Sequence, residues 1–248
     1  MRGKQFPAGS YEKLSAADMG LTYTGFERVA LDGVRRFESL DFEMALVILD
    51  GEADYAFGDC RGKARHRDML YVPMHQSIDL SGSALVLCYC APCTRKTSFA
   101  HIQFAEVDAD ERHKVYGTRA QGTHRHVWNC IDDNFHAARL LMGFCDGEPG
   151  GWTAWPPHEH GCAREEVYYY TGMGDGFALQ CVYDELSDAD AAVIVREGDL
   201  VSIAGGYHPN VGCPKRGIHY IFCMVSVKEG DRQFMDLTIQ REFGDKLE

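Results

Sequence analysis

The stretch WPPHEHGCAREEVYYY, residues 155–170, carries most of the information about the fold. Successive side chains of a β-strand point to opposite faces of a sheet, so side chains two positions apart share a face. In a strand, His158 and His160 would therefore direct two imidazoles to the same side. Glu165 or Glu166, at the start of the next apolar run, could add a carboxylate. The stretch therefore predicts a metal site supported by strands.

A fourth ligand would have to come from a strand that is distant in the sequence. His208 lies just past the predicted strand 200–203 and is the obvious source. Three histidines and one carboxylate suit zinc, and also manganese, iron, cobalt or nickel, whereas magnesium and calcium prefer more oxygen ligands. We therefore expect a divalent transition metal, with zinc as the first choice and manganese or iron as alternatives.

Two further motifs could bind metal or, for the cysteine pair, be redox-active, but the histidine pair is interpreted as structural or surface-exposed and the cysteine pair as structural. His124 and His126 form a second pair, but no acidic residue follows about five positions later and no distant partner is evident. Cys90 and Cys93 form a CxxC motif, but no second CxxC exists to complete a four-cysteine zinc site. The 10 cysteines are scattered through a chain long enough to build its own core. Most of them are expected to be buried, reduced thiols.

The rest of the chain has the pattern of an all-β protein, in which short apolar runs are broken by Gly, Asp, Asn and Pro. The run 44–49 meets Asp50 and Gly51, which predicts a hairpin turn. A short helix capped by Ser15 is expected near residues 15–19. Further strands are predicted at 69–73, 84–89, 138–144, 166–171, 177–183, 191–195, 200–203 and 220–227.

The two halves of the chain share a local order of turn, acidic residue, apolar strand and Pro or Gly bend, as in 67–73 and 197–206. This weak internal repeat predicts two similar β-barrel domains, 1–118 and 119–248. The polar segment 108–122 is the expected connection between them. A chain of 248 residues is long enough for either one large domain or two modest ones.

Charge and hydropathy restrict the partners. The net charge is 25 − 37 = −12, opposite in sign to that of a typical protein that binds nucleic acid or anionic membranes. No apolar run approaches the roughly 18 residues of a membrane span, and residues 1–7 lack the apolar segment of a signal peptide. We therefore expect a cytoplasmic protein with neither nucleic acid nor membrane as a partner. Exposed β edges make a homo-oligomer plausible.

These residues resemble the two motifs of the cupin superfamily, in which an HxH, a Glu and a later His bind a divalent metal inside a jelly-roll barrel. The closer resemblance is to the bicupin family of 5-deoxyglucuronate isomerases and the related 5-keto-4-deoxyuronate isomerases. It covers roughly residues 139–227 and is thin before them. The implied fold is all-β, with two cupin-like jelly-roll barrels. The resemblance is carried, in the family's order, by 155–160, 166–170, 176–183, 198–201 and 206–209.

Residue by residue, the resemblance places the metal ligands on His158, His160, Glu166 and His208. The general cupin spacing would select Glu165 instead of Glu166. The family's Glu-Val-Tyr run selects Glu166, which we favour.

The N-terminal half resembles a barrel without a metal. Pro73 and His75 lie where a second cupin motif would be, but no HxH precedes them. We therefore expect the N-terminal barrel to be structural and the C-terminal barrel to carry the metal.

The resemblance implies an intramolecular aldose–ketose isomerase that converts 5-deoxyglucuronate to 5-dehydro-2-deoxygluconate in myo-inositol breakdown. A metal holding the carbonyl and hydroxyl oxygens would act as a Lewis acid. Proton transfer through a base and a hydride shift both stay open, and no residue is assigned as the base. The alternatives are an isomerase of another deoxyuronate or sugar, an iron-dependent cupin dioxygenase, and a non-catalytic sugar-binding bicupin.

An anionic uronate requires a local cation in an acidic protein. Lys215 and Arg216, in the loop after His208, are the first candidates, and Arg164 is the third. Side chains on or beside the predicted site strands could form hydrogen bonds with sugar hydroxyls. These candidates are Tyr168, Tyr170, Gln180, Tyr183 and Tyr207.

Overall fold

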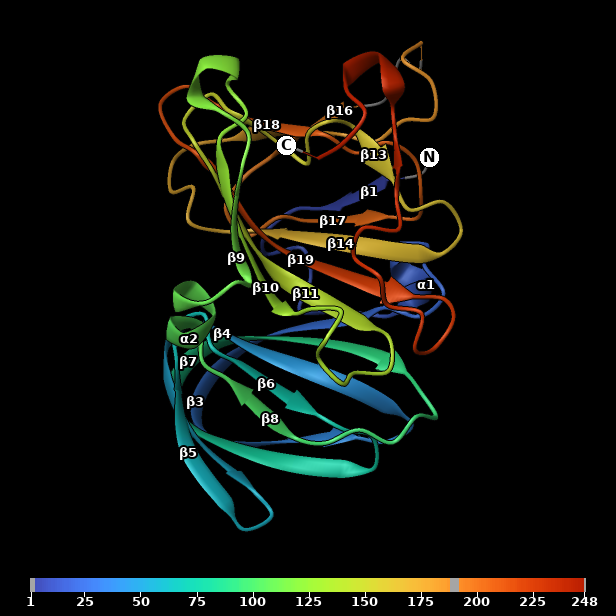
Figure 1. Ribbon diagram of the computed structural model, residues 1–248. Helices are drawn as coiled ribbons and strands as arrows, with labels where there is room; N and C mark the ends of the chain where they lie inside the picture. The colour runs from blue at the N-terminus through green and yellow to red at the C-terminus, as the bar shows by residue number, and fades with distance from the viewer. Residues whose placement is uncertain (1–2, 188–191, 248) are drawn as a thin grey trace.

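The computed structural model describes residues 3–187 and 192–247, and it consists of two β regions stacked on each other (Figure 1). Strands dominate both regions, and helices are few and short. None of the helices in these two ranges is long and apolar enough to cross a membrane. The all-β architecture with two cupin-like barrels that was predicted from the sequence is confirmed.

The N-terminal barrel is one strongly bent sheet of seven strands, in which long strands curl around an apolar interior. Its strand order is β2-β3-β7-β4-β6-β8, and β5 pairs with β4. The strands are β2 (Lys13–Leu14), β3 (Gly25–Ser39), β4 (Phe42–Phe57), β5 (Cys60–Arg65), β6 (Met69–Val72), β7 (Gln76–Pro92) and β8 (Ala100–Ile102).

The C-terminal barrel is built from a seven-stranded sheet, a four-stranded sheet and a pair of short strands. The large sheet has the order β1 (Gly3–Phe6), β17 (Leu200–Ile203), β14 (Arg164–Tyr170), β19 (Ile218–Ser226), β11 (Leu140–Gly147), β10 (Arg125–Ile131) and β9 (His113–Tyr116). The smaller sheet has the order β12 (Trp152–Thr153), β18 (Asn210–Gly212), β15 (Ala178–Cys181) and β16 (Ala192–Val195). The short pair is β13 (His158–Glu159) with β20 (Thr238–Ile239).

Helices occur only as short segments in the described part of the chain. They are α1 (Ala16–Met19), α2 (Phe104–Ala109) and the 3-10 turns Arg119–Gln121 and Arg241–Phe243. The predicted helix is confirmed, because the Ser15 hydroxyl accepts a hydrogen bond from the Asp18 backbone N–H and the Asp18 side chain accepts one from the Ser15 N–H. This reciprocal pair satisfies donors that a helix start leaves without partners.

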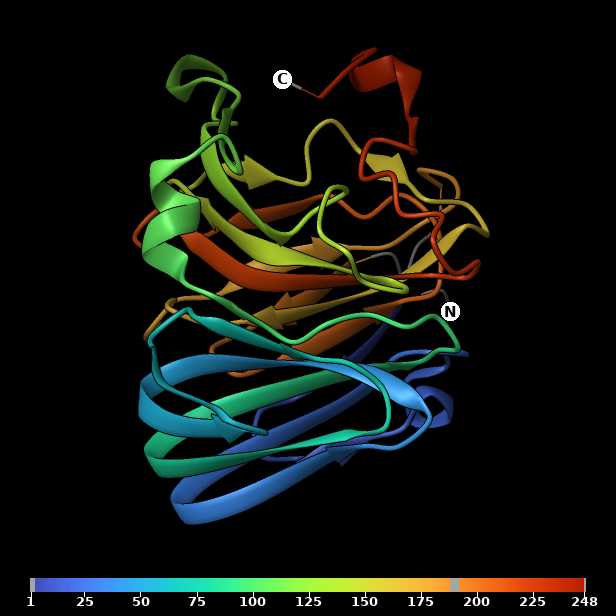
Figure 2. The same cartoon turned by 60° about the horizontal axis from the view of Figure 1, so that its bottom comes forward.

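One apolar core joins the two barrels. Strand β4 is buried on both faces, so Leu46 and Ile48 face the N-terminal interior while Ala45 and Val47 face the C-terminal sheet. This is why the sequence of β4 reads as a continuous apolar run. Across the contact, the rings of Phe26 and Tyr169 stack with their centroids 5.8 Å apart, and both views show the two sheets face to face (Figures 1 and 2).

The sheets do not divide the chain at residue 118. Strand β1, from the start of the chain, pairs antiparallel with β17, and Gly3 lies opposite Ile203. Strand β9, inside the predicted connection 108–122, pairs with β10. Both strands therefore belong to the C-terminal sheet, although they lie in the segment assigned to the N-terminal domain.

The predicted hairpin at Asp50 and Gly51 is wrong. Strand β4 continues through both residues to Phe57, and the ladder with β7 shifts register between Ile48 and Asp50. The bulge lies at Leu49, which has no partner in this ladder, whereas Gly51, with φ +74°, stays paired with Ala84. The other predicted strands overlap observed ones, except that residue 191 of the segment 191–195 lies outside the described residues.

Candidate metal centre

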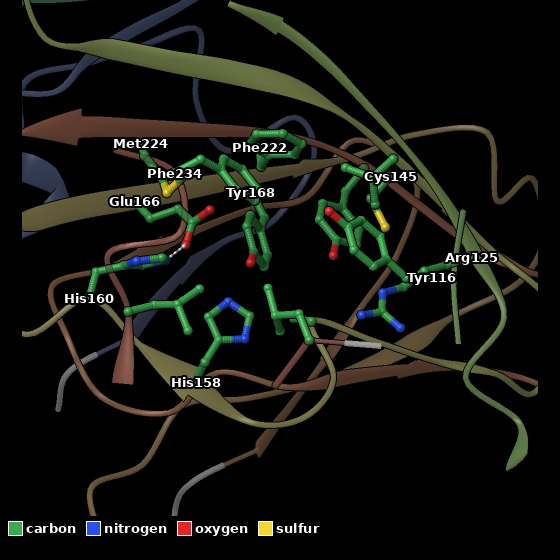
Figure 3. A pocket seen from close by; sticks show the side chains of 15 residues that line it. Tyr116, Arg125, Cys145, His158, His160, Glu166, Tyr168, Phe222, Met224 and Phe234 are labelled. Atoms are coloured by element: carbon green, nitrogen blue, oxygen red, sulfur yellow. Dashed lines mark ion pairs between the residues drawn. The ribbon is translucent and has the colours of Figure 1, made fainter. Parts of the chain in front are cut away.

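Three buried histidine side chains meet inside the C-terminal barrel. His158 lies on β13, His160 follows it, and His208 lies two residues before β18. One side-chain nitrogen of each residue lies within 4.8 Å of those of the other two. Figure 3 shows His158 and His160 at one end of a cavity, next to Glu166.

Glu166, on β14, brings a carboxylate to the same point. Its Oε2 lies 3.2 Å from Nε2 of His208 and 3.5 Å from Nε2 of His160. Burial raises the pKa of the carboxyl, but the adjacent imidazoles of His160 and His208 outweigh it and hold the pKa of Glu166 well below its usual range. Burial and the two neighbouring imidazoles also hold the pKa of His158 well below its usual range. The cluster therefore combines a carboxylate with a neutral imidazole at His158.

Backbone carbonyls orient two of the imidazoles. Nδ1 of His158 lies 3.0 Å from the Pro156 oxygen, and Nδ1 of His208 lies 2.8 Å from the Gly206 oxygen. Because a carbonyl only accepts hydrogen bonds, each Nδ1 carries a proton, which makes Nε2 the nitrogen that would coordinate a metal. Nε2 of His208 and Oε2 of Glu166 are buried without a hydrogen-bond partner in the described chain. Three histidines and a carboxylate, with unpartnered buried atoms on His208 and Glu166, form the donor set that a divalent transition metal takes.

Glu165, the alternative ligand, points to the other face of β14. Its carboxylate accepts hydrogen bonds of 2.8, 2.7 and 2.6 Å from the backbone N–H groups of Thr22, Tyr23 and Thr24. It therefore fixes the segment before β3 to the C-terminal sheet and does not approach the histidines.

The cavity beside the cluster has aromatic and apolar walls (Figure 3). Tyr168 lines it, and its ring stacks on that of Tyr220 at a centroid distance of 4.4 Å. Burial raises the pKa of Tyr168 well above its usual range and that of Cys145 to about 12, so both keep their protons. The remaining wall is largely apolar and includes Phe222, Met224, Phe234, Leu237 and Leu247.

Two predicted sugar-binding residues support His208 instead of lining the cavity. Tyr170 donates a hydrogen bond to Oε1 of Gln180, which also accepts one of 2.9 Å from Asn210. Nε2 of Gln180 donates to the His208 carbonyl at 2.9 Å. The buried network therefore holds the backbone of His208 in place.

Tyr183 and Tyr207 also lie outside the cavity lining. The Tyr183 hydroxyl donates a hydrogen bond to Oε1 of Gln240 at 2.8 Å. The ring of Tyr207 packs against the ring of Tyr183, with the two ring centroids 5.9 Å apart. This contact joins the smaller sheet to the segment that follows β20.

The three predicted cations do not line the cavity either. Lys215 and Arg216 lie in an exposed loop. Their side chains are 3.9 and 2.8 Å, respectively, from the carboxylate of Asp175. Arg164 is buried, and its Nη1 donates to the Asp236 carbonyl at 2.8 Å.

Four further residues line the cavity and were not predicted from the sequence: Arg125, Tyr116, Cys145 and Tyr220. Arg125 lies between His124 and His126, whose rings are directed elsewhere: Nδ1 of His124 lies 3.1 Å from Glu148, and Nδ1 of His126 lies 2.8 Å from Nε2 of His113. Alternation along β10 could have identified Arg125, since it shares a face with the apolar Val127. The 10 cysteines are all free, as predicted, but only five of them are buried, so the expectation that most would be buried is not met.

Comparison with solved structures supports the fold. An IolB-like protein from Salmonella typhimurium LT2 superimposes with a TM-score of 0.84 at 22% identity, covering 96% of this chain and 97% of that one. The Lactobacillus farciminis oxalate decarboxylase superimposes with a TM-score of 0.66 at 11% identity, covering 96% of this chain and 88% of that one.

Sequence comparison gives more specific relatives. A 5-deoxy-glucuronate isomerase of Shouchella clausii is 28% identical over 78% of this chain and 78% of its own length. One from Geobacillus thermodenitrificans is 27% identical over 87% of this chain and 85% of its own length. The model of the KduI/IolB family matches residues 2–240. This chain belongs to the KduI/IolB family.

Proposed function

We propose that this protein is a metal-dependent aldose–ketose isomerase that converts 5-deoxyglucuronate to 5-dehydro-2-deoxygluconate, a step of myo-inositol breakdown. The family match and the relatives named 5-deoxy-glucuronate isomerase support the reaction class. The observation that carries the proposal is the buried group of three histidines and Glu166 at the end of a cavity.

The proposed ligands are His158, His160, Glu166 and His208, with zinc as the first choice of metal and manganese or iron as alternatives. The orphaned acceptors on His208 and Glu166 support this set. The N-terminal barrel is proposed to be structural. The enzyme is proposed to act in the cytoplasm on a small uronate, without nucleic acid or membrane partners, and to form a homo-oligomer.

The reaction moves one hydrogen from C2 to C1 while the C1 carbonyl becomes a hydroxyl and the C2 hydroxyl becomes a carbonyl. Atoms and electrons balance within the substrate, so no oxidant is needed. A divalent ion held by His158, His160, Glu166 and His208 would supply Lewis acidity for this exchange. Tyr168 stays protonated and can donate a hydrogen bond to a substrate oxygen. Phe222 and Phe234 exclude water, which strengthens the electrostatic interactions of the site.

The test follows 5-deoxyglucuronate by proton NMR with the purified protein, with a chelator-stripped sample, and with a stripped sample to which zinc, manganese or iron(II) is returned. We expect conversion that stripping abolishes and one of the metals restores. A protein that binds metal and leaves this substrate unchanged would contradict the proposed reaction. Oxygen consumption in the same samples would indicate the dioxygenase alternative.

A further inference from the structure

Arg125 is a buried cation that faces the cavity. It begins β10, is 3% exposed, and lies in Figure 3 beyond Tyr168 from His158, His160 and Glu166. Within the described ranges 3–187 and 192–247, it is the only Lys or Arg among the residues that line this cavity.

The contacts of Arg125 leave part of its guanidinium free. Nη1 donates to the Thr123 carbonyl at 2.9 Å, and Nη2 donates to the Trp155 carbonyl at 2.5 Å. Cζ lies 5.2 Å from the ring centroid of Tyr116. A guanidinium has five N–H donors, so these two bonds leave three donors without a hydrogen-bond partner among the described residues.

Arg125 also has no carboxylate partner in the described chain, since no Asp or Glu oxygen there lies within 4.0 Å of its guanidinium nitrogens. A buried charge without a counter-ion is costly. Burial accordingly lowers the pKa of Arg125 from its ordinary value, although the guanidinium remains the protonated form at neutral pH. Arg67, by contrast, is also partly buried but is paired with Asp146 at 2.7 Å.

We propose that Arg125 binds the carboxylate of the uronate substrate, and so selects acidic over neutral sugars. This inference rests on the proposed function. The guanidinium offers the paired donors that a carboxylate accepts. The histidines and Glu166 at the other end of the cavity are the proposed metal ligands, which leaves Arg125 as the cation for the carboxylate. The substrate therefore lies with its carbonyl end at the histidines and its carboxylate at Arg125.

Selectivity is the quantity to measure. The natural comparison uses 5-deoxyglucuronate and the matching neutral 5-deoxyhexose, in which CH2OH replaces the carboxylate. In Arg125→Gln we expect kcat/KM for the uronate to fall about 100-fold, mainly through KM, because one partner of a buried charge pair is lost. The value for the neutral sugar should change little. Arg125→Lys should keep part of the preference, since it retains the charge without the paired donors.

A matched control is Arg232→Lys. Arg232 is another buried arginine, held by the carbonyls of Leu140 and Asp132 at 2.9 and 2.7 Å, and it does not line the cavity. This variant should keep the uronate preference of the wild type. Metal content and the thermal unfolding midpoint, measured for every variant, separate lost folding from lost recognition.

A second readout needs no turnover. Titration calorimetry of 5-deoxyglucuronate into metal-stripped protein should show binding by the wild type and at least about tenfold weaker binding by Arg125→Gln. That result, together with no isomerisation by the metal-loaded wild type, would retain the role of Arg125 and remove the proposed function. An unchanged preference between the two sugars in Arg125→Gln, or an equal loss with both, would overturn the role of Arg125.

Discussion

The two barrels have related folds, but one has an apolar, filled interior and the other has polar side chains beside a cavity. Leu46, Ile48 and Val86 fill the N-terminal interior with close-packed apolar side chains. The C-terminal interior instead places His208 and Glu166 beside a cavity, with acceptors that no described protein group satisfies. An apolar interior gains its stability from packing, whereas buried acceptors cost stability until a ligand satisfies them. The interior of the N-terminal barrel therefore stabilises the fold, whereas the buried acceptors of the C-terminal barrel destabilise it in the absence of a ligand.

The corresponding position in the N-terminal barrel shows how local this difference is. His75 has a side chain that is 61% exposed, and it adopts φ +58° in the turn before β7. It lies outside the N-terminal apolar core. A histidine directed to solvent contributes nothing to an interior site.

The largest effect should come from His208→Ala, which removes one of the four proposed ligands. We expect metal affinity to fall by more than the 10- to 100-fold that loss of a residue supporting a ligand typically costs. Isomerase activity should fall with it. Elemental analysis after dialysis measures the metal content, and His75→Ala is the matched control in the other barrel. Full metal content in His208→Ala would contradict the proposed site.

An intermediate effect should come from Leu46→Ala in the N-terminal interior. Leu46 is fully buried, so the variant should lose about 2–5 kcal/mol of unfolding free energy through lost burial and the resulting cavity. Urea denaturation measures this loss. Metal content per folded molecule should stay at the wild-type value, and a loss of metal would show that the two interiors are coupled.

A smaller effect should come from Asp146→Asn at the contact between the barrels. The Asp146 carboxylate accepts hydrogen bonds of 2.7 and 2.8 Å from Arg67 and lies 3.0 Å from Nδ1 of His219. Burial raises the pKa of Asp146, but His219 and Arg67 outweigh it and the net shift is downward. The variant should lose roughly 1–3 kcal/mol of unfolding free energy at pH 7.

The pH dependence of that loss follows from the direction of the shift. The folded pKa of Asp146 lies below the unfolded value of about 3.9, so the ionised carboxylate stabilises the fold above that pH. Its contribution disappears as the pH falls through the folded pKa. Denaturation at pH 7 and at pH 3 should therefore show a smaller gap between wild type and Asp146→Asn at pH 3. A gap that is constant or grows on acidification would rule out this pair as its source.

The alternation of side chains along a strand was sufficient to predict which residues share a face of that strand. Adjacent residues of β14 point to opposite sides, so only one of Glu165 and Glu166 can face the cavity. Alternation alone does not show which of the two glutamates faces the cavity. That choice depends on the backbone donors of residues 22–24, which are distant in the sequence.

Long-range contacts explain the other differences. The turn preference of Asp50 and Gly51 was overridden because the pairing of β4 with β7 continues from Phe42 to Ala56. Pairing of β1 with β17 has no local signal at all. Arg125 was missed because a basic residue between two histidines is typical of a solvated surface, and only the tertiary structure buries it.

The pairing of β1 with β17 also determines when the protein can fold during its synthesis. Gly3 leaves the ribosome 200 residues before its partner Ile203. At a synthesis rate of about 5–20 residues per second, the first strand waits about 10–40 s for its place in the sheet. Strand β13, which carries His158, can pair with β20 only after Ile239 has been synthesised. The N-terminal barrel can therefore form on the nascent chain, whereas the metal centre is completed only after almost the whole sequence has emerged.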